Sequence, residues 1–263
     1  MKKRFGFLTV ILAVFAFIYM AQPANTVQVK NLEMLTLNIP FYCDRVSKNM
    51  QRALTHGERV YVCRLELDNG VVGYGESTGD ESGAIDQVVG QNPFAIMHDE
   101  GVGFGIQMAL FDVVGKTVEV PIYQLLGRKV RDRCPISWWT IDMPPEDWAE
   151  EAKESLKRGY TSIKLKARPW WDIFAQVEAV GDVVPQDYHF YIDFNGFLLT
   201  KDRAIPLLQS LDEYPNVAYY ESPFWLRTDF EGAGQLQEAV EKPIIDHFRD
   251  AYLHRGVGAG FVI

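Results

Sequence analysis

Four short apolar runs between residues 160 and 248 each carry charged side chains at or near their ends. The runs are Ser-Ile-Lys-Leu-Lys, ending at Lys166; Tyr-Ile-Asp-Phe-Asn-Gly, around Asp193; Tyr-Tyr-Glu-Ser-Pro-Phe, with Glu221; and Pro-Ile-Ile-Asp-His-Phe, with Asp246 and His247. From Lys166 onward they recur at intervals of 27, 28 and 25 residues, about the length of one strand and one helix. Charged residues at the ends of successive strands are typical of the active-site end of a parallel βα barrel. The repeat therefore predicts such a barrel.

The segment from Cys134 to the end of the chain alternates between predicted strands and helices. The expected strands are residues 136–141, 163–167, 189–194, 217–221 and 244–248, with a sixth beginning at residue 260. A closed (β/α)8 barrel takes about 250 residues, and only about half of that length follows Cys134. We therefore expect an incomplete (β/α)8 TIM-type barrel of about five and a half βα units over residues 134–263.

The predicted barrel would leave its first and last strands as unpaired edges, which is an aggregation hazard. For this reason we expect the chain to be C-terminally truncated, a fragment of a longer enzyme. The alternative is an open doubly wound sheet, which tolerates five or six strands. Against this alternative, no glycine-rich phosphate turn follows the first predicted strand.

The preceding part, residues 27–130, predicts a separate α+β domain. An extended segment at 27–41 and two runs on either side of Asp68-Asn-Gly70 predict three strands, two of them joined as a hairpin. Residues 42–58 are polar and irregular, which indicates a loop. Helical patterns follow near 81–96, 103–116 and 120–127.

The first 24 residues have the pattern of a secretory signal. Three basic residues precede an apolar run from Phe5 to Met20, and small residues follow it. The run is shorter than the roughly 20 residues that a spanning helix needs. Gln22, however, stands where a small residue is wanted before cleavage, so a retained membrane anchor is the alternative. With either interpretation we expect the folded part to be exported, as a periplasmic, extracellular or membrane-anchored protein.

The composition limits the class of partner. A hydrophobic content of 48% and an aromatic content of 13% predict a folded core. The net charge is −9, and no Lys/Arg-rich patch is interleaved with aromatic residues. We therefore expect no nucleic-acid partner.

Side-chain alternation groups the charged residues at the strand ends. Lys164 and Lys166 share one face of a strand, which in a barrel is the interior, and a buried lysine beside a second cation can act as a base near neutral pH. Asp193 and Asn195 share a face in the same way, and Asp193 is a hard oxygen ligand that suits Mg²⁺. Taken singly, the lysines are also typical of a solvent-facing strand end, and Asp193, Asn195 and Glu221 of turns. Together, at consecutive strand ends, they indicate an active site.

With these motifs the chain resembles the enolase superfamily, and within it the mandelate racemase/muconate lactonising enzyme group. The resemblance covers about residues 27–248 and rests on Ala109-Leu-Phe-Asp-Val-Val-Gly-Lys116, Pro121-Ile-Tyr-Gln-Leu-Leu-Gly127, Lys164-Leu-Lys166, Asp193-Phe-Asn195 and Glu221-Ser-Pro223. It implies that residues 27–130 are a capping domain whose loops, here about 42–58, close over the barrel.

The resemblance further implies an Mg²⁺-dependent lyase or isomerase. Such enzymes remove the proton α to a carboxylate, and the metal stabilises the enediolate. The reaction would be that of a racemase, a sugar-acid dehydratase or a cycloisomerase, and the partner a small-molecule carboxylate. At full length we expect a homo-oligomer.

The resemblance also assigns roles to the strand-end residues. Lys166 is the implied base, and Lys164 would help to bind the carboxylate or lower the pKa of Lys166. Asp193 and Glu221 are the implied Mg²⁺ ligands. Asn195 is the implied contact to the substrate.

The fifth strand departs from the family pattern. The positions that usually hold the third acidic ligand are His247 and Phe248 here, and Asp246 comes one residue early. We take Asp246 as the third ligand, because a hard cation prefers oxygen. His247 stays open as the alternative at this position, or as a proton donor.

Two hypotheses of different classes follow. The first is an exported enzyme of carboxylate α-proton abstraction, whose opposing catalytic base would lie beyond Ile263, so that the sequence does not choose among the reactions. The second is a non-catalytic or inactive member of the same superfamily that acts as an exported binding protein.

Overall fold

The structure of the protein, a computed structural model, describes residues 27–52, 54, 56–247 and 260–261. Within them the chain divides into two compact units. The first unit takes the described residues up to Ile39 together with Glu58–Asp132, and the second takes Pro40–Gly57 and the described residues from Arg133 onward. None of the helices in these residues has the length and apolar character that crossing a membrane requires. The signal or anchor predicted at 1–24 lies outside the described residues.

The first unit is built on a three-stranded antiparallel sheet. Its strands, in spatial order, are β1 (Val29–Asn38), β2 (Arg59–Leu67) and β3 (Val72–Ser77). The turn between β2 and β3 forms at the Asp-Asn-Gly signal, where Gly70 adopts a φ of +85° and the Asn69 side chain accepts a hydrogen bond from the N–H of Val71. The sequence therefore located this hairpin correctly.

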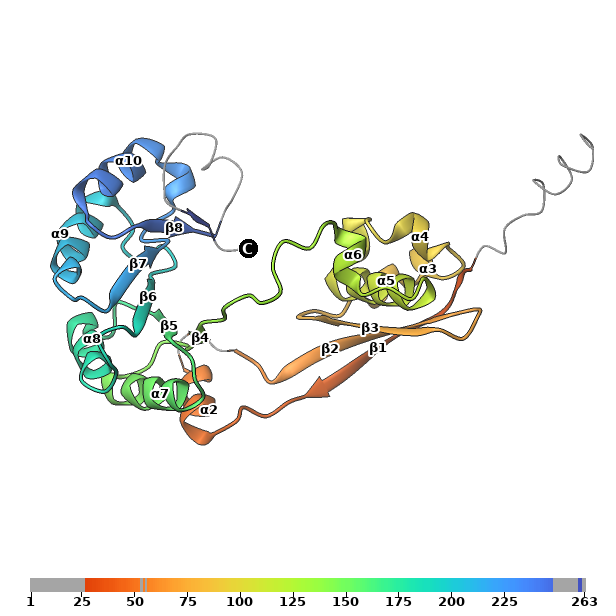
Figure 1. The fold of residues 1–263 in the computed structure, drawn as a ribbon, viewed down its shortest axis with the longest axis horizontal. Coiled ribbons are helices and arrows are strands. Elements are labelled where there is room, and N and C mark those ends of the chain that lie inside the picture. The colour runs from red at the N-terminus through yellow and green to blue at the C-terminus, as the bar shows by residue number, and fades with distance from the viewer. Residues whose placement is uncertain (1–26, 53, 55, 248–259, 262–263) are drawn as a thin grey trace, which may run out of the picture. The chain divides into compact units, whose positions relative to one another are not determined.

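The long helix α5 (Phe104–Thr117) packs against β2 and β3 (Figure 1). Its apolar stripe and the inward side chains of β2 form one fully buried core, with Ile106, Ala109, Leu110, Val113, Leu65 and Leu67 as members. The helix approaches β3 closely because β3 has glycine at the contact. A Cβ atom on Gly73 would lie 2.8 Å from the carbonyl oxygen of Ala109.

The helix predicted near 81–96 is interrupted in the structure. This stretch forms three short pieces, η1 (Ser82–Ala84), α3 (Ile85–Val88) and α4 (Pro93–Ile96). The chain leaves the helical conformation at Val89, whose ψ is 133°, and Gly90 follows with a φ of +82°. A helix starts again where Asn92 accepts a hydrogen bond from the N–H of Phe94. The remaining short helices of this unit are η2 (Glu100–Val102) and α6 (Ile122–Leu126).

The second unit contains a six-stranded parallel sheet whose strands follow one another in sequence order. They are β4 (Trp138–Trp139), β5 (Ser162–Lys166), β6 (His189–Asp193), β7 (Val217–Glu221), β8 (Ile244–Asp246) and β9 (Gly260–Phe261). The predicted strand at 136–141 is thus reduced to two residues, and the one at 244–248 ends at Asp246 within the described residues.

Four helices lie on the outer side of the curved parallel strands (Figure 1). They are α7 (Pro145–Lys157), α8 (Ile173–Gly181), α9 (Lys201–Asp212) and α10 (Phe230–Ala239), with the short η3 (Leu226–Thr228) before the last. α7 begins at Pro145 and carries Glu146 and Asp147 in its first turn, where the missing N–H and the helix dipole favour these residue types. This strand–helix alternation carries the carboxyl ends of β5, β6 and β7 to one edge of the sheet.

Residues 42–58, predicted as a polar loop, contain a helix. This helix, α2 (Asp44–Met50), belongs to the second unit, and Val46 and Met50, four positions apart, are buried in the core of that unit. The loop prediction was wrong because the two apolar positions are few among polar neighbours, and the surface that buries them comes from residues distant in the sequence.

Candidate active site

The ends of β5, β6 and β7 bring three charged side chains into one row. Lys166 pairs in register with Asp193, and Asp193 pairs with Glu221, so the three side chains point to the same face of the sheet. Asp193 and Glu221 are 0% and 1% exposed, and Lys166 is 9% exposed. Two carboxylates are therefore buried side by side, an arrangement that needs positive charge nearby.

The two lysines supply this charge. Lys166 Nζ lies 2.5 Å from Asp193 Oδ2. Lys164 Nζ lies 2.6 Å from Glu221 Oε2 and 3.2 Å from Asp193 Oδ2. The Lys-x-Lys motif thus places both ammonium groups on the same pair of carboxylates, as the alternation of the strand predicts.

The cluster alters the pKa values of its members. Burial lowers the pKa of Lys166 below its ordinary value; Asp193 opposes this shift and Lys164 adds to it. Burial and the neighbouring Asp193 raise the pKa of Glu221 to about 7, although Lys164 acts in the opposite direction. For Asp193, burial favours the neutral form, but Lys166 and Lys164 outweigh it and hold the pKa below its usual value. Lys166 is therefore shifted toward the neutral form that a base requires.

His247 also belongs to the cluster. Its Nε2 lies 2.7 Å from Glu221 Oε1 and 3.8 Å from Asp193 Oδ2. Each of Asp193, Glu221 and His247 offers a ligand atom, and these three atoms lie within 4.8 Å of one another. Burial lowers the pKa of His247, which favours its neutral form. Two carboxylates and one neutral imidazole are a donor set that fits a divalent cation.

The structure does not bring Asp246 to this cluster. The carboxylate of Asp246 is buried, and its Oδ1 accepts hydrogen bonds from the Ser222 hydroxyl at 2.5 Å and from the N–H of His247 at 2.9 Å. Ile245 pairs in register with Glu221, so alternation turns Asp246 to the other face and returns His247 to the face of Glu221. Within the described residues it is therefore His247, and not Asp246, whose side chain lies with those of Asp193 and Glu221.

Asn195 lies where the sequence placed it, beside Lys166 and Asp193. Its backbone N–H donates to Asp193 Oδ1 at 2.8 Å, and Lys166 Nζ donates to Asn195 Oδ1 at 3.1 Å. The residue adopts a φ of +45°, a conformation that Asn tolerates better than most residues. Its amide group is thus held at the edge of the cluster, within reach of a molecule bound there.

Sequence reasoning missed Arg168. Its side chain is buried, and Nη2 donates to Asn195 Oδ1 at 2.7 Å. Arg168 follows Lys166 by two positions and so continues the alternation of the Lys-x-Lys motif. This parity was the signal that pointed to it.

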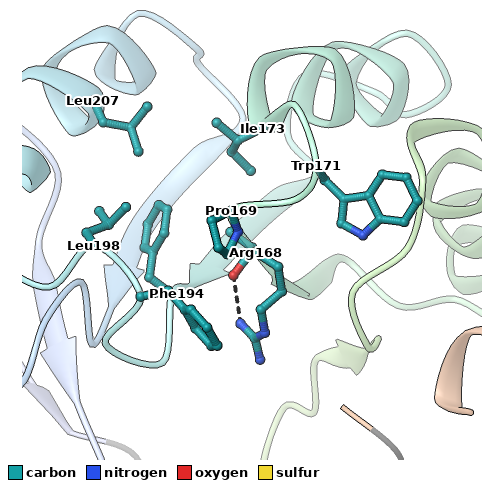
Figure 2. Close-up of a pocket in the computed structure, with 9 residues that line it drawn as sticks. Arg168, Pro169, Trp171, Ile173, Phe194, Leu198 and Leu207 are labelled. Carbon is teal, nitrogen blue, oxygen red and sulfur yellow. Dashed lines mark hydrogen bonds between the residues drawn. The ribbon is translucent and has the colours of Figure 1, made fainter. Parts of the chain in front are cut away.

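A cavity of about 190 Å³ lies between the loops that follow β5 and β6 (Figure 2). Its lining is largely apolar and consists of Ala167, Arg168, Pro169, Trp171, Ile173, Phe194, Phe197, Leu198 and Leu207. Because Phe194 alternates with Asp193, the cavity lies on the other side of the β6 strand end from the carboxylates. Arg168, which lines the cavity and donates to Asn195 Oδ1, connects the cavity wall to the edge of the charged cluster.

A family model described as "Enolase C-terminal domain-like" matches residues 147–246, from the first turn of α7 to the end of β8. Over this segment the chain is similar to the enolase superfamily. The resemblance inferred from the motifs is thus confirmed, and the relatives are racemases, epimerases, dehydratases and cycloisomerases of the mandelate racemase/muconate lactonising enzyme group.

Two curated relatives illustrate how far this chain resembles known enzymes. It is 26% identical over 211 residues to N-succinyl-L-Arg/Lys racemase of Bacillus cereus, covering 70% of this chain and 57% of the racemase. It is 26% identical over 222 residues to arabinonate dehydratase of Saccharolobus solfataricus, covering 72% of this chain and 58% of the dehydratase. The chain therefore spans somewhat more than half the length of these relatives.

Solved structures show the same fold. The dipeptide epimerase of Enterococcus faecalis V583 has a TM-score of 0.71 and 23% identity, covering 89% of this chain and 73% of the epimerase. That epimerase is also known complexed with Mg and the dipeptide L-Leu-L-Tyr. The small antiparallel sheet followed by a parallel sheet agrees with the enolase-superfamily TIM-barrel fold.

Proposed function

We propose that this chain carries part of an active site that removes the proton α to a carboxylate, with a divalent metal ion as cofactor. The observation that carries the proposal is the position of Lys166, a buried amine in contact with Asp193 and Asn195 beside a second lysine. The resemblance to the enolase superfamily also supports it. The residues of the sequence motif are the same residues that the strand ends bring together.

Each residue then has a defined task. Lys166 in its neutral form accepts the proton at Nζ, and its lowered pKa makes that form available. Lys164 attracts the carboxylate of the substrate, and the amide of Asn195 orients the bound molecule. A divalent ion held by Asp193 and Glu221 would, when bound, supply further positive charge for the substrate carboxylate. Mg²⁺ is the ion that the sequence motifs favour and that a solved neighbour contains.

Removal of the α-proton is the chemical step that we propose, and it is common to several reactions. Racemisation, epimerisation, elimination of water and cycloisomerisation all begin with the removal of this proton. The relatives include enzymes of each kind. The substrate class is therefore a small carboxylate with an acidic α-hydrogen.

The test is exchange of the α-hydrogen with solvent. The whole chain would be incubated in D₂O with a divalent metal and a panel of N-succinyl amino acids, dipeptides and sugar acids, and deuterium incorporation followed by NMR. Lys166→Ala should lower the exchange rate by about 100-fold or more. Lys153→Ala, an exposed lysine of α7 that pairs with Glu150, is the matched control and should leave the rate unchanged.

Absence of exchange with every carboxylate and metal, or an unchanged rate in Lys166→Ala, would overturn the enzymatic proposal. Binding of a carboxylate without exchange would instead support the non-catalytic binding protein.

Two further proposals concern the rest of the chain. We propose that the first unit caps the active site, which is the role its α+β sequence pattern implies. We also propose that the chain is exported, on the basis of the basic and apolar residues at 1–24. Fractionation of cells that express a C-terminally tagged chain tests the second proposal, which fails if the tag stays in the cytoplasm.

A further inference from the structure

The residue that completes the carboxylate pair is an imidazole and not a third acid. Among the described residues, the only group of His, Cys, Asp and Glu side chains with converging ligand atoms is Asp193, Glu221 and His247. The two acids are almost fully buried, whereas the His247 side chain is 36% exposed. A metal ion held here would have oxygen atoms of the two carboxylates and a nitrogen of the imidazole as its ligands.

The local structure holds His247 in this place. Asp246 Oδ1 accepts the backbone N–H of His247 and the hydroxyl of Ser222, which is itself fully buried. The N–H of Ser222 in turn donates to the carbonyl oxygen of Ile245 at 2.9 Å. Asp246 Oδ1 thus sets the backbone that presents His247 to Glu221, whereas Asp246 Oδ2 is buried and has no hydrogen-bond partner within the described residues.

The ligand atoms of this site determine which divalent ions bind to it most tightly. Mg²⁺ prefers an octahedral shell of oxygen atoms and gives up its water reluctantly. Imidazole suits Zn²⁺, Fe²⁺, Co²⁺ and Ni²⁺, and affinity for a given mixed site rises along that part of the transition series. The ion must also displace the lysines, since Lys166 and Lys164 lie 2.5 and 2.6 Å from the two carboxylates. An ion that forms a strong bond to the imidazole nitrogen can compensate for the lost lysine–carboxylate ion pairs better than Mg²⁺ can.

We propose that Asp193, Glu221 and His247 form a site selective for a divalent transition metal, such as Zn²⁺, Fe²⁺ or Co²⁺, over Mg²⁺. The inference rests on the proposed function only in that both place the metal at the same two carboxylates. It changes the identity of the cofactor and assigns a ligand role to His247.

The test is metal binding by the whole chain, without any substrate. Titration calorimetry gives the dissociation constants for Mg²⁺ and Zn²⁺, and the visible absorption of bound Co²⁺ reports a nitrogen ligand. We expect Co²⁺ and Zn²⁺ to bind at least about tenfold more tightly than Mg²⁺. Asp193→Asn provides the background, because other histidines and cysteines of the chain can bind zinc.

Two replacements of His247 make the result specific. His247→Ala should weaken Zn²⁺ and Co²⁺ binding by about tenfold or more, change the Co²⁺ spectrum and leave Mg²⁺ binding nearly constant. His247→Asp creates an all-oxygen donor set and should raise the affinity for Mg²⁺ relative to Zn²⁺. Circular dichroism checks that both variants are folded, which their position at a partly exposed site favours.

The proposal is overturned if Mg²⁺ binds as tightly as Zn²⁺, or if His247→Ala leaves Zn²⁺ binding unchanged while Asp246→Asn abolishes it. These outcomes are distinguishable from failure of the proposed function. If α-hydrogen exchange occurs with Mg²⁺ and is unchanged in His247→Ala, the proposed function holds and the transition-metal site is excluded. If Zn²⁺ binding depends on His247 but no carboxylate exchanges its α-hydrogen, the metal site holds and the proposed function is excluded.

Discussion

The pKa of Lys166 is shifted in opposite directions by its surroundings. Burial and the charge of Lys164 lower its pKa, while the carboxylate of Asp193 raises it, and the net shift is downward. A base must be neutral to accept a proton, so a lowered pKa moves its working range toward neutral pH. The same position would be of little use with an ordinary lysine pKa.

This shift predicts the pH dependence of α-hydrogen exchange. The rate should rise with pH and level off below the pH at which an ordinary lysine loses its proton. Lys164→Met removes the neighbouring cation, so the pKa of Lys166 should rise and the curve should move to higher pH. The measurement is the exchange rate in D₂O buffers over a pH series. A curve that moves to lower pH in Lys164→Met would contradict the assignment, and Lys153→Met should leave the curve in place.

At the scale of elements, two carboxylates of α7 bond to α2: Asp147, which accepts from the Asn49 amide at 2.7 Å, and the more deeply buried Glu151. Glu151 is 1% exposed, and it accepts hydrogen bonds from Tyr42 at 2.5 Å, from Arg45 at 2.7 and 3.0 Å and from Trp138 at 3.1 Å. A buried carboxylate with all its hydrogen bonds made stabilises such a contact. Removal of the carboxylate would leave its several hydrogen-bond donors without an acceptor. Glu151 therefore helps to attach residues 40–57 to the rest of the second unit.

Glu151→Ala should lower the free energy of unfolding by about 2 kcal/mol and increase hydrogen exchange of the α2 amides. Denaturant unfolding and hydrogen-exchange mass spectrometry measure the two effects. Glu150→Ala is the matched control, because that carboxylate is 52% exposed and pairs with Lys153; it should change stability by less than about 0.5 kcal/mol. Equal effects of the two replacements would show that Glu151 has no special role.

The contact of β3 with α5 depends on the absence of a side chain at Gly75. A Cβ atom there would clash with the carbonyl oxygen of Gly105 and would lie 2.8 Å from both Ala109 N and Met108 Cβ. Gly75→Ala should therefore destabilise the first unit by about 1–3 kcal/mol, measured by urea unfolding. Gly79→Ala, where no atom lies within 4 Å of the added Cβ, should be close to neutral. A stable Gly75→Ala variant would mean that helix and strand separate at little cost.

At the scale of the whole molecule, the buried apolar side chains among the described residues form two clusters. One lies within the antiparallel unit and the other within the unit that holds the charged cluster. All the proposed metal ligands belong to the second unit. Binding of a ligand to one folded unit stabilises that unit by mass action.

Metal should therefore raise the unfolding temperature of the second unit alone. At about 100 times the dissociation constant the expected stabilisation is about 2.7 kcal/mol. Scanning calorimetry with and without metal measures the shift, and Asp193→Asn should abolish it. Two transitions that rise together with metal would show that the units unfold as one.

The strand-end motifs were readable without coordinates because alternation and period are properties of consecutive residues. Lys164 and Lys166 share a face wherever the strand lies, and the repeat places Asp193 and Glu221 at neighbouring strand ends. The same reasoning located the hairpin at Asp68-Asn-Gly70 and the superfamily itself.

Two features needed the folded chain. Whether Asp246 or His247 faces Glu221 depends on the register between β7 and β8, and a shift of one residue exchanges the two faces. The helix at Asp44–Met50 depends on burial of two apolar side chains in a core contributed by residues about 100 positions later. Local patterns carry neither kind of information, because register and burial arise from contacts between segments that are distant in the sequence.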